Sequence, residues 1–259
     1  MDKRFDPDSP SETVSPTTPA IRTDGLRKQY GDTVAVDGLD LSVESGSVFG
    51  FLGPNGAGKT STIRILTTLT EPTAGSAHVA GHPVSDRATV VDHIGFLPEE
   101  PPLYDELTGR EQLEYIAGLR GYEDWDRVES LLSRFDLAGD ADRRVDTYSK
   151  GMKRKLGLVQ ALLHEPEVLF LDEPTSGLDP RAARTVRDTI DEVAAADTTV
   201  FLSTHILPVV EELADTVGVL SDGDLVAEGG PAELTDRAET GTTLEDVFLD
   251  VTSEAHTQR

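Results

Sequence analysis

The stretch Gly53-Pro54-Asn55-Gly56-Ala57-Gly58-Lys59-Thr60 fits the pattern G-x-x-x-x-G-K-[ST]. The largely apolar residues 47–52 before it predict a strand, and the residues from Ser61 to Leu69 after it predict an amphipathic helix. Glycines allow backbone N–H groups to approach phosphate oxygens closely, and the start of the helix adds unpaired N–H groups. Lys59 would place a charge at the β- and γ-phosphates, and the Thr60 hydroxyl is placed to bind Mg²⁺. The alternative is an ordinary glycine-rich turn, but the flanking strand and helix favour a site for nucleotide phosphates.

The chain of 259 residues is strongly acidic, with 48 Asp and Glu against 23 Lys and Arg and a net charge of −25. The acidic residues are spread over the whole chain, so the surface would repel itself at low ionic strength and be screened at molar salt. We therefore predict a protein adapted to high intracellular salt, as in a halophilic archaeon. Because phosphate neutralisation needs basic patches, the acidic composition also predicts that nucleic acid is not the main partner.

Three further properties bound the class of protein. The absence of cysteine excludes disulfides, a thiol nucleophile and cysteine-ligated metal, and favours the cytosol. No apolar run reaches about 18 residues, so no segment is expected to span a membrane. Residues 1–20 are polar and rich in Ser, Thr, Pro and Asp, which predicts a disordered N-terminal extension.

The order of strand and helix patterns predicts an α/β fold with two kinds of sheet. Residues 21–30 and 33–43 predict antiparallel strands joined at Gly31-Asp32, with a second turn at Asp37-Gly38. Farther along, strands alternate with helices, which predicts a mainly parallel sheet with helices on both faces. The expected strands lie at residues 76–79, 94–99, 168–173, 198–203, 216–220 and 224–227, and the expected helices at 180–195 and 206–214.

A helical subdomain is predicted at about residues 101–163, inserted into the α/β core. Two apolar faces are expected there, one with Leu113, Ile116, Ala117 and Leu119 and another with Trp125, Val128, Leu131 and Leu132. The last helix of this region is expected to begin after Ser149, a good N-cap residue, and to run to Leu163. Its N-terminus is a second place able to receive an anion.

Two carboxylates follow the apolar residues 168–171, at the carboxyl end of a strand, where α/β sheets bind ligands. Asp172 can hold Mg²⁺, directly or through water, while Glu173 points the other way and can orient or deprotonate an attacking water. A charged pair at a strand end is common, but the phosphate-binding stretch upstream favours the functional interpretation. His205 also follows a strand, and although a lone histidine is usually structural, this one is expected to face the phosphate.

Together these residues closely resemble the nucleotide-binding subunits of ABC (ATP-binding cassette) transporters. The matching segments are Gly53–Thr60 (Walker A), Val168–Glu173 (Walker B), Ser176–Asp179 (D-loop), YSKGM at residues 148–152 (signature), His205 (switch histidine) and Tyr30 (aromatic stacked on adenine). A tyrosine at a strand end is more often a packing residue, so the role of Tyr30 rests on the resemblance. The resemblance covers about residues 21–231, which would form the ATPase domain, and residues 232–259 would form a C-terminal tail.

The resemblance implies a P-loop NTPase core with a mainly parallel sheet, an antiparallel β-subdomain and an inserted α-helical subdomain. It further implies a dimer with two ATPs between its subunits, each bound by the P-loop of one subunit and by Ser149 and Gly151 of the other. The implied catalytic residues are Lys59, Glu173 as general base and His205 at the γ-phosphate, and the implied Mg²⁺ ligands are Thr60, Asp172 and Glu99. Closure of the dimer, from identical or pseudo-symmetric subunits, would complete the catalytic site.

Two departures from the family pattern are relevant to function. The signature retains only Ser149 and Gly151, since Lys150 adds a cation and Met152 replaces the glutamine. The Q-loop position holds Glu99, which can still bind Mg²⁺ or water but adds a negative charge. The segments 97–100 (LPEE), YSKGM and 244–249 (LEDVFL) are similar to ABC-2-type exporter ATPases. This similarity implies a separate integral membrane permease, which the chain would energise from the inner face of the cell membrane.

Two other functions remain open from the sequence. Soluble ABC ATPases that act on ribosomes or in DNA repair resemble two cassettes in one chain or carry a long coiled coil. Here one cassette holds a short helical insert without a heptad repeat. The second alternative, a regulatory module that binds nucleotide without hydrolysing it, would not need both Glu173 and His205.

Overall fold

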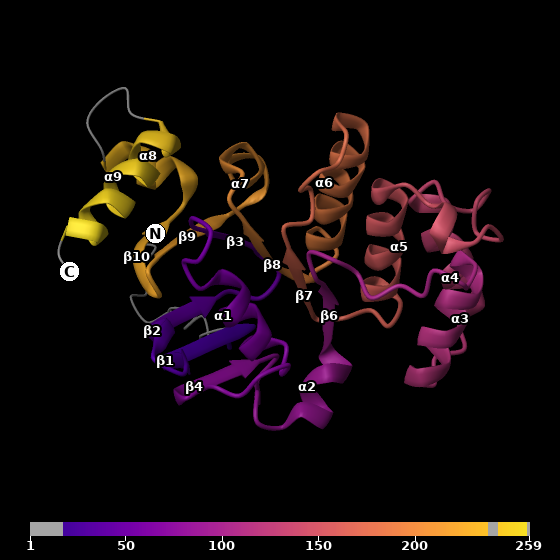
Figure 1. Ribbon diagram of the computed structural model, residues 1–259, viewed down its shortest axis with the longest axis horizontal. Helices are drawn as coiled ribbons and strands as arrows, with labels where there is room; N and C mark the ends of the chain where they lie inside the picture. The colour runs from indigo at the N-terminus through magenta and orange to yellow at the C-terminus, as the bar shows by residue number, and fades with distance from the viewer. Residues whose placement is uncertain (1–17, 238–242, 258–259) are drawn as a thin grey trace, which may run out of the picture.

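The computed structural model describes residues 18–237 and 243–257, which form two β-sheets with helices packed around them (Figure 1). The strands are β1 (Ile21–Tyr30), β2 (Thr33–Val43), β3 (Val48–Leu52), β4 (Ala74–Val79), β5 (His82–Pro83), β6 (Ile94–Leu97), β7 (Val168–Asp172), β8 (Thr199–Thr204), β9 (Thr216–Ser221) and β10 (Asp224–Gly229). The helices are α1 (Lys59–Leu66), α2 (Arg87–His93), α3 (Gly109–Arg120), α4 (Trp125–Arg134), α5 (Lys150–Leu162), α6 (Pro180–Ala194), α7 (Leu207–Leu213), α8 (Pro231–Arg237) and α9 (Leu244–Thr257), with a short 3₁₀ turn at Val145–Thr147. Most of the predicted N-terminal extension, residues 1–17, lies outside the described residues.

The central sheet has the strand order β10-β9-β3-β8-β7-β6, and all its neighbouring strands except β10 and β9 pair in parallel. Every residue of β3 and β7 is buried, as expected for strands covered on both faces. Helices α6 and α7 cover one face, while α1 and the second sheet lie against the other (Figure 1). The predicted α/β architecture with a mainly parallel sheet is confirmed.

The parallel strands bring the predicted site residues to one edge of the central sheet. β3 lies between β8 and β9, and β8 lies between β3 and β7. Their carboxyl ends therefore meet, so the loop after Leu52, the carboxylates after Leu171 and the histidine after Thr204 adjoin one another.

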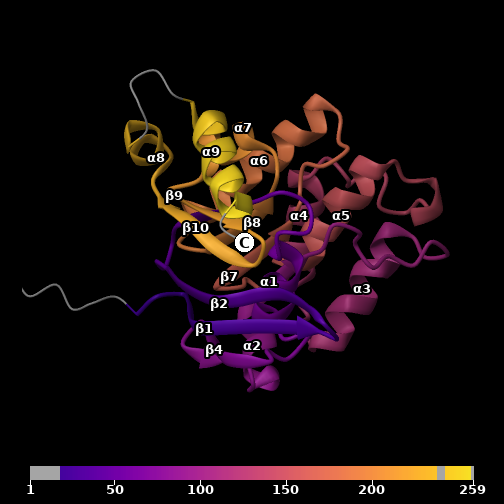
Figure 2. The same ribbon diagram turned by 60° about the vertical axis from the view of Figure 1, so that its left-hand side comes forward.

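The second sheet has the order β2-β1-β4-β5 and is antiparallel throughout, so the predicted antiparallel β-subdomain is confirmed. Helix α1 packs between the two sheets, with Ile63 in a common core with Leu26 and Phe51 (Figure 2). The prediction of a turn at Asp37-Gly38 is wrong. These residues lie inside β2, where Gly38 has φ 72° and the pairing with β1 shifts register, so the local turn signal produces a bulge and the strand continues.

Two helix predictions near the start of the chain need correction. The helix expected to reach Leu69 ends at Leu66, because Thr68 has a left-handed backbone (φ 61°) and leaves Leu69 exposed. Helix α2 was not expected from the sequence. It is a short segment of seven residues capped by Asp86, whose side chain accepts from Thr89 N, and only Val90 of the helix is buried.

The helical subdomain contains α3, α4 and α5, which share one apolar core with the face of the central sheet that α6 covers. Thr108 starts α3 with a capping box, and Ser149 caps α5 as predicted. The predicted faces are only partly correct, because Leu119 and Trp125 are 68% and 46% exposed. Leu119 lies two residues after buried Ala117, which is about 200° around a helix, so it points away from the core.

Residues beyond 231 form helices that pack on the central sheet (Figure 2). Leu234 of α8 and Leu244 and Val247 of α9 are buried in one cluster with Val217 and Val219 of β9. These helices extend the core past the boundary at residue 231 that the sequence predicts. Across the residues that the structure describes, no helix combines the length and the apolar character needed to cross a membrane.

Candidate functional site

A cavity of about 250 Å³ opens at the carboxyl edge of the central sheet. Its lining residues are Ala35, Asn55, Gly56, Gly58, Lys59, Thr60, Ser61, Glu99, Asp172, Glu173 and His205. They come from β2, from the loop between β3 and α1, from the first turn of α1, from the end of β7, and from the loops that follow β6, β7 and β8. Segments far apart in the sequence thus converge on one polar cavity.

The loop between β3 and α1 is held tightly between two neighbouring segments. Gly58 has φ 112°, and a Cβ at this position would lie 2.2 Å from the carbonyl oxygen of Ala35. On the other side, the N–H of Gly223 in the β9–β10 turn donates to the carbonyl of Ala57 at 2.9 Å. Only glycine fits position 58, because both the backbone angle and the close approach exclude a side chain.

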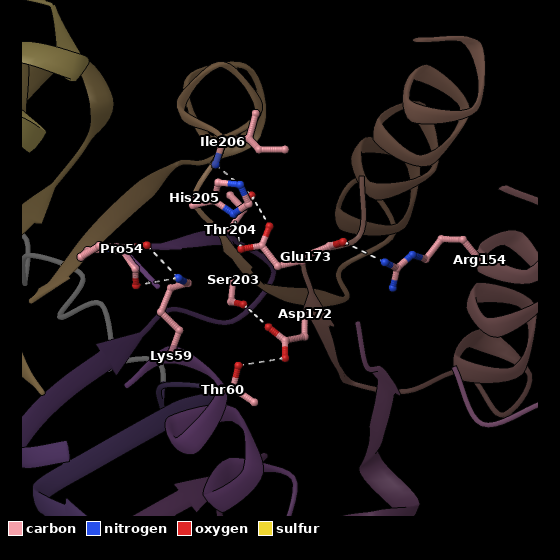
Figure 3. A network of polar contacts seen from close by, with 11 residues as sticks. Pro54, Lys59, Thr60, Arg154, Asp172, Glu173, Ser203, Thr204, His205 and Ile206 are labelled. Atoms are coloured by element: carbon pink, nitrogen blue, oxygen red, sulfur yellow. Dashed lines mark hydrogen bonds and ion pairs between the residues drawn. The ribbon is translucent and has the colours of Figure 1, made fainter. Parts of the chain in front are cut away.

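Lys59, the first residue of α1, is a buried cation that this loop surrounds, with 6% of its surface exposed. Its Nζ donates to the carbonyl oxygens of Gly53 at 2.7 Å and Pro54 at 3.2 Å (Figure 3). Burial lowers the pKa of Lys59, and the negative charges of the nearby carboxylates, led by Glu173 and Asp172, oppose that shift. Helix α1 begins at this cation, and its N-cap residue, Gly58, has no side chain with which to cap the helix. The loop therefore offers an anion both a cation and unpaired N–H groups.

Asp172 joins the loop to the central sheet. Its Oδ2 accepts a hydrogen bond from Thr60 Oγ1 at 3.3 Å, and its Oδ1 accepts from Ser203 Oγ (Figure 3). Asp172 as a whole is 5% exposed. Hydroxyl and carboxylate oxygens are the ligands that Mg²⁺ prefers, so Thr60 and Asp172 fit this metal, with Glu99 on the same cavity wall. The described residues contain no group of three or more His, Cys, Asp or Glu that could hold a metal alone. Substrate phosphates and water would complete the ligand set.

Glu173 points away from Asp172, toward the end of β8 (Figure 3). Its Oε1 lies 2.8 Å from His205 Nδ1, and its Oε2 accepts from Thr204 Oγ1 at 3.1 Å. Its backbone has φ 49°, which is rare for a residue with a side chain. A carboxylate held in this way at a cavity wall can accept a proton from a water molecule.

Other predicted site residues lie outside the cavity lining. Tyr30 is 44% exposed at the end of β1, with Lys28 Nζ 5.0 Å from its ring centroid. Ser149 accepts from the N–H of Met152 at 3.2 Å, and Gly151 lies close to Ala182 at the start of α6. Gly53, Pro54 and Ala57 form the backbone of the loop around Lys59. The structure therefore brings the predicted phosphate-binding residues, the two carboxylates and His205 together around one cavity. Tyr30, Ser149 and Gly151 lie outside the lining of this cavity.

The sequence did not single out four residues that shape the site, namely Ala35, Arg154, Ser203 and Thr204. Ser203 and Thr204 end a strand whose last polar residues point at Asp172 and Glu173. Arg154 is 2% exposed and donates to the carbonyl oxygens of Pro98 and Glu173. Its position four residues before buried Leu158 places it on the core face of α5, which helical spacing could have revealed.

Comparisons with known proteins agree on one family. A family model described as "ABC transporter" matches residues 36–176. The chain is 47% identical over 234 residues to "Daunorubicin resistance ATP-binding protein DrrA3" of Streptomyces coeruleorubidus, covering 89% of this chain and 73% of that protein. It is 38% identical over 237 residues to "Nod factor export ATP-binding protein I" of Cupriavidus metallidurans, covering 90% and 78%. A solved structure described as the ATP binding subunit of an ABC transporter aligns with a TM-score of 0.83 and 30% identity, over 90% of this chain and 99% of that one.

Proposed function

The chain belongs to the ABC transporter family as an ATP-binding subunit with ATPase activity, and from this premise we propose how its own residues bind ATP, hydrolyse it and serve transport. The observation that carries the proposal is that Lys59, Asp172, Glu173 and His205 line one cavity beside the start of α1. A cation, a metal-binding carboxylate and a held general base are the groups that phosphoryl transfer to water requires.

ATP binding is proposed to use the loop of residues 53–60 and the first turn of α1. The phosphates would take over Lys59 Nζ from the carbonyls of Gly53 and Pro54, since a charged acceptor forms a stronger hydrogen bond than a carbonyl. Ser61 and the backbone N–H groups of the loop would complete the phosphate cradle. Tyr30 is exposed and would stack on the base.

Hydrolysis is proposed to be attack of water on the γ-phosphorus with ADP as the leaving group. Glu173 would take the proton of the attacking water, and His205, which holds Glu173 Oε1, would contact the transferred phosphoryl group. When bound to Thr60 and Asp172, Mg²⁺ would neutralise charge on the phosphates. Glu99 would be a further oxygen ligand for the metal, and its carboxylate lies on the same wall.

We also propose that two ATPase subunits assemble around the nucleotides. Ser149 lies at the N-terminus of α5 and Gly151 in its first turn, both outside the cavity of their own chain. A second subunit would supply these residues, and its N–H groups would face the γ-phosphate. The partner is an identical chain or a pseudo-symmetric one.

A membrane permease is proposed as the partner that the ATPase energises, for export. Beside the site, an apolar groove of about 530 Å³ is lined by residues that include Leu69, Phe96, Pro101, Pro102 and Gly157, with Glu99 in its wall. A cytoplasmic segment of the permease would occupy this groove and sense the position of Glu99. The chain would then lie peripherally at the inner face of the cell membrane. The relatives' names, which refer to drug resistance and to export, support this assignment over ribosome or DNA-repair work.

The test is an affinity purification of the tagged chain from gently solubilised membranes in molar KCl. A polytopic membrane protein recovered in near-equal amount supports the transporter assignment. Recovery of ribosomes or repair proteins alone would overturn it and leave the ATP site intact. The same complex, reconstituted into sealed lipid vesicles and assayed for ATP-dependent transport of candidate compounds, tests the cargo.

A further inference from the structure

Arg154 is a charged residue in the interior of the protein, in the second turn of α5. Its Nη1 donates to the carbonyl oxygen of Pro98 at 2.8 Å, and its Nη2 donates to the carbonyl oxygen of Glu173 at 3.1 Å. Figure 3 shows the second bond reaching from α5 to the loop after β7. Both acceptors belong to the backbone, so the guanidinium fixes the path of two loops.

The three segments that meet at Arg154 each carry a residue of the proposed site. α5 begins just after Ser149, Pro98 precedes Glu99, and Glu173 follows β7. A planar guanidinium presents several N–H groups in a fixed arrangement, so one side chain can serve two acceptors at once. Arg154 thereby connects the helical subdomain to the two loops that bear the carboxylates.

The backbone of Glu173 needs such support. Its left-handed φ of 49° persists only where the surroundings hold it. The N–H of Glu173 donates to Ser203 at 2.9 Å, and its carbonyl accepts both from Ser176 N at 3.1 Å and from Arg154. Removing Arg154 therefore takes away one of the bonds that determine where the carboxylate points.

Packing along α5 ties the same helix to the loop after β6. A Cβ on Gly157, one turn after Arg154, would lie 2.7 Å from Leu97 and 2.9 Å from Pro101. The helix and this loop are thus in close contact on both sides of Pro98. A displacement of α5 would therefore be transmitted by Arg154 to the loops that carry Glu99 and Glu173.

The charge of Arg154 also complements the site. Burial lowers the pKa of this guanidinium, while the negative charges of Glu99, Asp172 and Glu173 oppose the shift. Glu99 adds a carboxylate at the Q-loop position, where the family pattern has a neutral glutamine. A cation held behind the three carboxylates reduces their mutual repulsion.

We propose that Arg154 is a positioning residue for ATP hydrolysis: its bond to the carbonyl of Glu173, with its second bond anchored at the carbonyl of Pro98, sets the orientation of Glu173 according to the position of α5. This inference rests on the proposed role of Glu173 as general base. Arg154 acts through Glu173 and touches no reacting atom itself.

The first test replaces Arg154 by Gln and by Lys and separates ATP binding from hydrolysis. For Arg154→Gln, kcat is expected to fall about 10- to 100-fold because a misplaced catalytic group reacts poorly, while the Kd of a fluorescent ATP analogue stays within about twofold. Arg154→Lys keeps the positive charge but loses the planar guanidinium that serves two acceptors at once. Its kcat is therefore expected to be low, as in Arg154→Gln. Wild-type kcat in either variant, or a loss confined to ATP binding, would overturn the proposal.

Arg127→Gln is the matched control, since Arg127 also donates to two carbonyls, those of Leu162 and Leu163, at the far end of α5. Both Gln variants are expected to melt at lower temperature, by roughly 5 °C, because buried or partly buried carbonyls lose their donors. Only the Arg154 variants should lose kcat. An equal loss of kcat in Arg127→Gln would reduce the effect to general destabilisation and overturn the proposal. If Arg154→Gln does not fold, Arg154→Lys carries the test against the same control.

A double variant decides whether Arg154 acts through Glu173. Single-turnover hydrolysis is measured for Glu173→Gln, with and without Arg154→Gln. In the Glu173→Gln background, Arg154→Gln is expected to reduce the rate by less than about twofold. The reason is that the effects of two residues that act through the same step do not add. The full single-variant factor in this background would refute the proposal. A wild-type rate in Glu173→Gln alone would instead refute the proposed function of Glu173, and the two failures are thus distinguishable.

Discussion

His205 Nδ1 lies 2.8 Å from Glu173 Oε1, so the residue after β8 holds the carboxylate that follows β7. The second carboxylate oxygen accepts from Thr204, the last residue of β8. Because β7 and β8 are parallel neighbours, their loops leave the sheet side by side, and this relationship is built into the topology. The carboxylate faces the cavity with its orientation already determined.

Glu173→Gln should abolish most hydrolysis and leave ATP binding intact. Glutamine has nearly the same shape but cannot take a proton at pH 7, so kcat is expected to fall by about 10²- to 10⁴-fold. Phosphate release measures kcat, and titration with a fluorescent ATP analogue measures affinity. A variant that hydrolyses ATP as fast as the wild type would remove the general-base assignment.

Lys59→Ala should weaken ATP binding directly. The change removes the buried cation of the loop, and a hydrogen bond to a charged group contributes enough to predict about a 10- to 100-fold rise in Kd. Equilibrium binding of labelled ATP is the measurement. Unchanged affinity would count against phosphate binding by the loop.

Gly58→Ala should distort the loop that holds Lys59. The new methyl group would overlap the carbonyl of Ala35, and φ 112° is strained for alanine, so both ATP binding and the melting temperature are expected to fall. Gly81→Ala is the control, because Gly81, in the turn between β4 and β5, also has a positive φ of 77° but open space around it. That variant is expected to lose about 1 kcal/mol of stability and no ATP affinity. Equal effects of the two substitutions on ATP affinity would contradict the steric argument.

Much of the fold and the site could be predicted because strong local signals agreed with the topology. The apolar residues 168–171 predicted a buried strand, and the carboxylates after it were expected at the ligand-binding edge. The glycine-rich loop between a strand and a helix likewise fixed the phosphate side of the cavity. These features depend on short stretches of sequence and on the direction of the strands.

The features that were missed depend on contacts between distant segments. Asp37-Gly38 has the composition of a turn, but pairing with β1 keeps it in a strand. Helical spacing places Arg154 on the core face of α5, but an arginine is usually exposed, and the carbonyls of Pro98 and Glu173 that accept its bonds allow it to be buried here. The sequence contains no local signal for the pairing of Asp37-Gly38 with β1 or for the contacts of Arg154 with Pro98 and Glu173.

His164 should make the protein less stable in mild acid. Burial holds the pKa of His164 below its ordinary value of 6.5. Its Nε2 lies 2.8 Å from the carbonyl of Ile94, and among the described residues the buried Nδ1 has no hydrogen-bond partner, so a second proton would be unpaired. Below pH 6.5 the unfolded chain binds the proton more strongly than the folded one, so stability falls as the pH drops through this value. Urea unfolding at pH 7.5 and pH 5.5 measures the effect, and His164→Gln should reduce the difference. An equal difference in the variant would exclude His164 as a source.

Salt should stabilise the fold, because a net charge of −25 repels itself at low ionic strength. Raising KCl shortens the screening length from about 10 Å at 0.1 M to about 3 Å at 1 M, so the thermal unfolding midpoint is expected to rise over this range and level off. A variant with Glu106, Glu114 and Glu123 changed to Gln is the control, since these exposed side chains add charge to the helical subdomain. Its midpoint should be higher than the wild type at 0.1 M KCl and converge with it at several molar. An unfolding midpoint of the wild type that does not rise with KCl would show that the acidic surface is no adaptation to salt. A rise of equal size in the wild type and in the variant would assign the effect to ion exclusion from the surface.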